Sequence, residues 1–93
     1  MPFKDVDTKK LADKLGIDFE EVKEKQRLIE QIVKTRKAKR MSQAALAKKV
    51  GVSQSRIAQI ESGVGTAKVT FDVLFGVLSA LGFTVKVQLK KTA

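Results

Sequence analysis

Cysteine and histidine are both absent from this chain of 93 residues. Without cysteine the chain can form neither a disulfide nor a thiolate metal site, and without histidine it lacks the commonest metal ligand and general base. No serine stands with a lysine or a carboxylate in a recognisable catalytic spacing. We therefore expect no metal, no cofactor and no enzymatic activity.

Long apolar runs and large aromatic side chains are also scarce. The longest uncharged run, residues 73–85, has 13 residues and is too short to cross a bilayer as a helix. The polar N-terminal residues do not resemble a signal peptide, so we expect a cytoplasmic protein with no membrane partner. The chain has five phenylalanines and no tyrosine or tryptophan, which argues against an RNA reader that stacks bases on aromatic rings.

Acidic residues are missing from the middle third of the chain. Residues 31–60 carry eight lysines and arginines and no aspartate or glutamate, whereas residues 1–30 carry eight acidic and seven basic residues. The whole chain has a net charge of +9 and a pI near 10.1. Such an excess favours a polyanionic partner. A run of basic residues is often only a solvated surface, so its meaning depends on the motif with which it coincides.

The most informative stretch is residues 42–63, SQAALAKKVGVSQSRIAQIESG. Ser42 and Ser53 each precede an apolar-periodic run, where a side-chain oxygen caps the first N–H groups of a helix. Gly51 lies between them, where the first helix must end. We attribute the small size of Ala47 and Gly51 to a close crossing of two helices. The residues interpreted as core are Leu46, Ala47, Val50, Val52, Ile57 and Ile60. This layout is typical of a helix-turn-helix whose second helix lies in the DNA major groove.

Three further helices are expected. A short one covers Asp7–Leu15, and a longer one begins after Asp18 with a capping box and runs to about Arg40. The last covers Phe71–Leu81. Gly76 inside it lowers helix propensity by roughly 1 kcal/mol, so we expect this glycine to mark a close contact.

The C-terminal residues FTVKVQLKK alternate strictly and predict a β-strand. One side of this strand carries Phe83, Val85, Val87 and Leu89. It is the only strand predicted, and a single strand cannot satisfy its own backbone donors and acceptors. It therefore pairs with the same strand of a second copy across a two-fold axis, pairs with a partner protein, or remains a frayed tail against the domain. We divide the chain into an N-terminal helical extension (1–30), a helix-turn-helix domain (31–82) and this dimerisation strand (83–93).

The pattern Q-x-x-L-A-x-x-x-G-V-S-x-x-x-I-x-x-I-E-x-G, present from Gln43 to Gly63, resembles the helix-turn-helix of Cro-like and phage-repressor-like regulators, the XRE family. The resemblance implies a lambda-repressor-like helix-turn-helix domain. With the helices and the strand predicted above, we expect an all-α fold of five helices and one C-terminal β-strand, for which the economical partner is the same strand of a second copy in a dimer. The C-terminal helix and strand, VTFDVLFGVLSALGFTVKVQL, look like those of the HigA and HipB antitoxins of toxin–antitoxin operons.

The family resemblance implies roles for individual residues. Those expected to read base edges are Gln54, Ser55, Arg56 and Gln59. Glutamine can pair with N7 and N6 of adenine, serine can donate or accept, and arginine can reach guanine or a phosphate. The residues expected to bind backbone phosphates are Gln43, Lys37, Lys39, Arg40, Lys48 and Lys68. The resemblance also implies an internal salt bridge between Arg36 and Glu61, which gives these two residues a structural role.

These expectations combine into one function. We expect a sequence-specific repressor that binds a pseudo-palindromic operator in double-stranded DNA as a homodimer, and that serves as the antitoxin of a type II toxin–antitoxin operon, repressing its own promoter. Two alternatives stay open: a stand-alone XRE-type repressor with no toxin partner, and a module that chiefly neutralises a toxin by binding it. Residues 1–30 serve either as a toxin-binding surface or as an extra helix packed on the domain.

Overall fold

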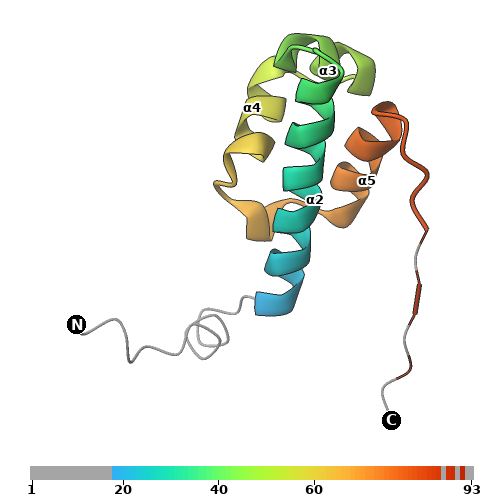
Figure 1. Ribbon diagram of the computed structural model, residues 1–93. Helices are drawn as coiled ribbons and strands as arrows, with labels where there is room; N and C mark the ends of the chain where they lie inside the picture. The colour runs from blue at the N-terminus through green and yellow to red at the C-terminus, as the bar shows by residue number, and fades with distance from the viewer. Residues whose placement is uncertain (1–17, 87, 90, 92–93) are drawn as a thin grey trace.

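A computed structural model of the chain describes residues 18–86, 88–89 and 91, which form a mostly helical fold (Figure 1). The elements are α2 (Phe19–Ala38), α3 (Gln43–Val50), α4 (Gln54–Ser62), the short 3-10 helix η2 (Thr66–Lys68) and α5 (Phe71–Ala80). The four α-helices correspond to four of the five helices predicted. The helix predicted over Asp7–Leu15 lies outside the described residues. No helix in the described part of the chain is long and apolar enough to cross a membrane.

Helix α2 begins and ends on local signals. The Asp18 side chain accepts a hydrogen bond from the N–H of Glu21 at 3.0 Å. Acidic residues occupy the first turn and basic residues the last, a distribution that complements the helix dipole. The helix ends at Ala38, slightly before the predicted end, because Arg40 adopts a left-handed backbone with φ 55° and cannot continue it.

Two serines and a glycine shape the connection through α3 to α4. Ser42 accepts a hydrogen bond from the N–H of Ala45 at 2.9 Å, and Ser53 accepts one from the N–H of Arg56 at 3.1 Å. Each bond satisfies a donor at the start of a helix. Gly51 ends α3 with φ +89°. A Cβ at Gly51 would meet nothing within 4 Å, so the close crossing predicted at this glycine is wrong; its left-handed backbone is what requires glycine.

Helix α2 is the central element of the core. It contacts α4, η2 and α5, and α3 contacts α4 and α5; Figure 1 shows α4 and α5 on opposite sides of α2. The largest fully buried side chains are Ile32, Leu46, Ile57, Ile60, Leu74, Leu81 and Val77. Val52 departs from the predicted core, since it is 40% exposed. It lies in the turn that leaves α3, outside any helix face that packs on another helix.

A buried lysine joins the first half of α2 to the rest of the core. Lys25 is 4% exposed. Its ammonium donates to the carbonyl of Ala67 at 3.3 Å, lies 3.7 Å from a carboxylate oxygen of Glu21 and stands 5.3 Å from the centre of the Phe71 ring. A cation over an aromatic face is attracted by the negative face of the ring. Helix α2 also runs without a break across residue 30, so the N-terminal extension and the helix-turn-helix domain share one helix.

The described residues beyond Gly82 belong to neither a helix nor a strand, so these residues of the single chain do not show the predicted C-terminal strand. A strand needs a partner for its backbone groups, and the described residues contain no other strand to provide one. In Figure 1 the segment runs along the α5 side of the molecule, away from α4. Phe83 is 37% exposed, Val85 36% and Leu89 92%; Val87 lies outside the described residues.

Replacing Gly76 with alanine is expected to stabilise the protein. Gly76 is exposed within α5, and a Cβ built on it meets nothing within 4 Å, so the close contact predicted at this position is wrong. Alanine restricts the unfolded chain and stabilises by about 0.4–1 kcal/mol, and we expect the midpoint of thermal unfolding to rise by about 2–8 °C.

Gly82→Ala is the matched control for this substitution. Gly82 has φ +97°, and its Cβ would lie 3.3 Å from the Lys39 ammonium, so alanine there should lower the midpoint. Melting curves recorded by circular dichroism measure both changes. A lower midpoint for Gly76→Ala would show that the space beside this helix position is not open.

Candidate nucleic-acid interface

Helix α4 presents polar side chains to solvent because its apolar side chains are buried on the opposite face. Ile57 and Ile60 are 1% and 2% exposed, whereas Gln54, Ser55 and Gln59 are exposed. Ser55 and Gln59 are four residues apart, so they share one face of the helix. Three of the four residues predicted to read bases therefore lie at the surface.

Arg56, the fourth of these residues, is half-buried and bonded within the helix. Its Nη1 donates to the amide oxygen of Gln59 at 3.3 Å. Side chains three residues apart meet on a helix surface. This spacing is a sequence signal for the pair of Arg56 and Gln59, which is not among the contacts predicted above. The other guanidinium N–H groups and the amide N–H groups of Gln59 remain donors for an external acceptor.

A buried ion pair fixes the C-terminal half of α4. Arg36 of α2 donates to Glu61 through Nε at 2.6 Å and through Nη2 at 2.9 Å, and its Nη1 donates to the carbonyl of Met41 at 2.8 Å. The side chains of Arg36 and Glu61 are 10% and 7% exposed. Gln43 of α3 adds a hydrogen bond to Glu61 at 3.0 Å. The structure thus brings three of the predicted residues together, and they tie α2, α3 and α4 into one frame.

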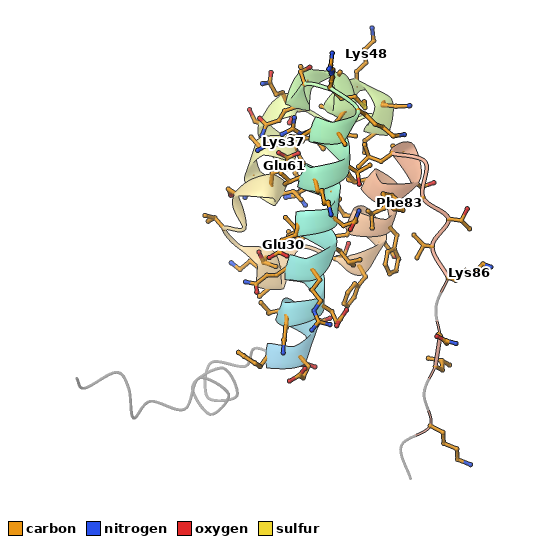
Figure 2. All side chains as sticks on the ribbon, in the orientation of Figure 1. Glu30, Lys37, Lys48, Glu61, Phe83 and Lys86 are labelled. Carbon is orange, nitrogen blue, oxygen red and sulfur yellow. The ribbon has the colours of Figure 1, made fainter. Side chains whose placement is uncertain are left out.

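This network sets the ionisation of both charged partners. Burial alone raises the pKa of Glu61, but hydrogen bonds from Arg36 and Gln43, with the positive charges of Arg36 and Lys37, hold that pKa below its usual value. The hydrogen bond to Glu61 raises the pKa of Arg36, against an opposing effect of burial. Both groups are therefore charged at neutral pH. Figure 2 shows Lys37 close to Glu61.

A comparison with protein families agrees with the geometry described above, namely the capped helices, the glycine turn and the polar face of α4. A helix-turn-helix family profile matches residues 32–87, more than half of the chain. The chain belongs to the XRE-type helix-turn-helix family. No curated protein and no solved structure gives a significant match. XRE-family proteins are DNA-binding transcription regulators and not enzymes, so the exposed face of α4 belongs to a DNA-binding protein.

In this XRE-family protein, five of the six residues predicted to bind phosphate are exposed: Lys37, Lys39, Arg40, Lys48 and Lys68. Figure 2 shows Lys48 projecting from the end of the molecule formed by α3. Two of the six have hydrogen-bond partners inside the protein. The Lys39 ammonium donates to the carbonyl of Leu81 at 2.7 Å and so satisfies an acceptor at the end of α5, while the Gln43 amide donates to Glu61.

Proposed function

We propose that this protein is a sequence-specific transcriptional repressor that binds a pseudo-palindromic operator, including one in its own promoter, as a homodimer. The observation that carries the proposal is the presentation of α4: Ile57 and Ile60 anchor the helix while Gln54 and Gln59 stay exposed. A glutamine amide carries both donor and acceptor groups, and it can pair with the major-groove edge of adenine. The second helix of a helix-turn-helix is the element that enters that groove.

The charge around α4 supports phosphate binding. Residues 31–60 contain no acidic residue, so no carboxylate of α3 or of the first turns of α4 repels the DNA backbone. The exposed side chains of Lys37, Arg40, Lys48 and Lys68 are available to phosphates. Each such contact releases counterions and makes the affinity fall with salt. Lys39 and Gln43 contribute only if DNA draws them away from their partners within the protein.

A homodimer fits an operator of two half-sites. Two recognition helices related by a two-fold axis reach successive major grooves about 34 Å apart. The C-terminal segment supports this assembly because its apolar residues Phe83, Val85 and Leu89 are exposed in the single chain. The segment lies on the side of the molecule away from α4 (Figure 1). Pairing there would leave α4 of each copy open to DNA.

Two alanine substitutions separate base reading from phosphate binding. Gln54→Ala is expected to reduce the preference for operator over random DNA by about five- to a hundredfold, because one base contact is lost. Lys37→Ala should weaken binding to both DNAs alike and reduce the slope of log affinity against log salt concentration by about 1. Lys34→Ala, at another exposed position of α2, is the charge-matched control.

Fluorescence anisotropy titrations at several salt concentrations measure these affinities. The two duplexes are the DNA upstream of the protein's own gene and a shuffled sequence of equal length. Equal affinity for both duplexes at moderate salt would argue strongly against a repressor of its own promoter. An unchanged salt slope in Lys37→Ala would remove this lysine from the phosphate contacts.

A second candidate function, the antitoxin of a type II toxin–antitoxin operon, is favoured by exposed apolar surface and by the concentration of acidic residues in the N-terminal part. Leu89 is 92% exposed, and residues 1–30 hold eight of the ten acidic residues. Co-expression with the adjacent open reading frame tests this role. An antitoxin should relieve the toxicity of the neighbouring protein and co-purify with it. A harmless neighbour that does not co-purify would leave a stand-alone repressor.

A further inference from the structure

Arg56 and Gln59 are joined in a way that changes which bases each can recognise. We propose that the two act as one unit that selects a guanine in the operator, whereas Gln54 alone pairs with adenine. This specificity rests on the proposed function, because it concerns the bases read by the same face of α4.

A hydrogen bond directs Arg56 toward the outward face of the helix. Its Nη1 lies 3.3 Å from the amide oxygen of Gln59. Gln59 is exposed on the face that it shares with Ser55, and Arg56 is half-buried beside it. The guanidinium is thereby held next to a side chain that faces solvent, instead of folding back over the core. Gln54, at the exposed start of the helix, is not part of this pair.

The charge of the first turn of α4 also points to an external acceptor. That turn holds no acidic residue, and Arg56 places a cation near the positive end of the helix dipole, where a cation is unfavourable. The charge of Arg56 at this position therefore does not contribute to the stability of the helix. A hydrogen-bond acceptor on a bound molecule would give the Arg56 guanidinium a partner.

The paired side chains offer mainly donors to such an acceptor, because the hydrogen bond from Arg56 occupies one of the two lone pairs of the Gln59 amide oxygen. With its oxygen turned to Arg56, the amide of Gln59 presents its NH₂ group, and Arg56 retains donors on Nε and Nη2. Guanine carries two acceptors, N7 and O6, on its major-groove edge, whereas adenine carries one acceptor and one donor. A pair that presents mainly donors matches guanine better than adenine. An amide whose oxygen is not engaged, as on Gln54, matches adenine.

Removing the guanidinium should therefore change the preferred base as well as the affinity. In Arg56→Ala the amide of Gln59 regains the use of its oxygen and can pair with adenine. We expect the position read by this pair to change from G·C in the wild type to A·T in Arg56→Ala. The double variant, Arg56→Ala with Gln59→Ala, should have no preference there.

Selection from a pool of randomised duplexes, followed by sequencing, tests this with the full-length chain. Anisotropy titrations then compare the best wild-type site with the same site after one G·C to A·T change. The wild type should bind the changed site about ten- to a hundredfold more weakly, and Arg56→Ala should bind it at least as well as the original. Lys34→Ala, which removes the same charge from an exposed position of α2, should keep the wild-type base preferences.

If Arg56→Ala weakens binding to every sequence alike and leaves the base preferences unchanged, Arg56 contacts a phosphate and the paired reading of guanine is wrong. It is also wrong if the double variant keeps the wild-type preference at every position. If the wild type enriches no sequence from the pool, the proposed repressor function fails as well, so the two failures give different results. Melting curves of each variant confirm that a folded protein is being compared.

Discussion

Replacing Arg36 with alanine is expected to lower the free energy of unfolding by about 3–5 kcal/mol. The substitution leaves the Glu61 carboxylate, with a side chain that is 7% exposed, without its cationic partner. It also removes the donor 2.8 Å from the carbonyl of Met41. A buried charge without a partner is unfavourable because it has lost the solvation that water gave it. Since a domain of this kind is stable by only about 5–15 kcal/mol, the variant should lose a large fraction of its free energy of unfolding.

Lys34→Ala is the matched control for this prediction. It removes the same charge from an exposed residue of α2 and should change the stability by no more than about 0.5 kcal/mol. Urea titrations followed by circular dichroism give both values. Replacing both partners, Arg36→Met with Glu61→Leu, should recover much of the loss, since no unpaired buried charge remains. Equal stabilities for Arg36→Ala and Lys34→Ala would show that the ion pair contributes little.

The same ion pair makes stability depend on pH. The pKa of Glu61 is lower in the folded protein than its ordinary value, so folding favours the ionised carboxylate. This stabilisation is fully present above the pKa of the unfolded chain, about 4.3, and is lost as the pH falls through the folded-state pKa. The pKa of Arg36 is raised, so its contribution is lost only at pH values above the ordinary range of arginine. Between neutral and acidic pH, the wild type should lose stability more steeply than Glu61→Gln.

The helices around α4 could be predicted because the signals that start and stop them are local. Ser42 and Ser53 each accept a hydrogen bond from an N–H three residues ahead, and Gly51 requires only its own left-handed backbone. The polar face of α4 was equally predictable, since burial of its apolar side leaves the other side to solvent. The helical period of the apolar residues could not predict whether Val52 is buried, because this residue lies outside both helices.

Contacts between distant segments could not be predicted in the same way. Lys25 and Lys39 each donate to a backbone carbonyl 42 residues further along the chain. A weak signal existed for Lys25, which lies one helical turn before the buried Ile29 and on the same face of α2. Lys39 is one of several basic residues in succession, and only the folded chain brings it to the end of α5. Arg36 and Glu61, 25 residues apart, were paired through the family resemblance and not through their spacing.

Charging the apolar side of the C-terminal segment is expected to abolish the proposed homodimer. Val85→Lys with Leu89→Lys places two cations where alternate side chains would meet the second copy. Such cations would be buried in the interface without partners, which opposes pairing. Thr84→Lys with Gln88→Lys is the matched control, because successive side chains of a strand point to opposite faces and the added charge is the same.

Sedimentation equilibrium should give the mass of one chain, 10.2 kDa, for the Val85 and Leu89 variant, and twice that mass for the wild type and the control. Operator affinity should fall by about 10²–10⁴-fold in the monomeric variant, because the second half-site no longer binds as part of the same molecule. The control should retain the wild-type affinity or exceed it, since its extra lysines also attract phosphates. A Val85 and Leu89 variant that remains dimeric would refute assembly through this segment. Its two recognition helices would then have to be brought together by another surface of the fold.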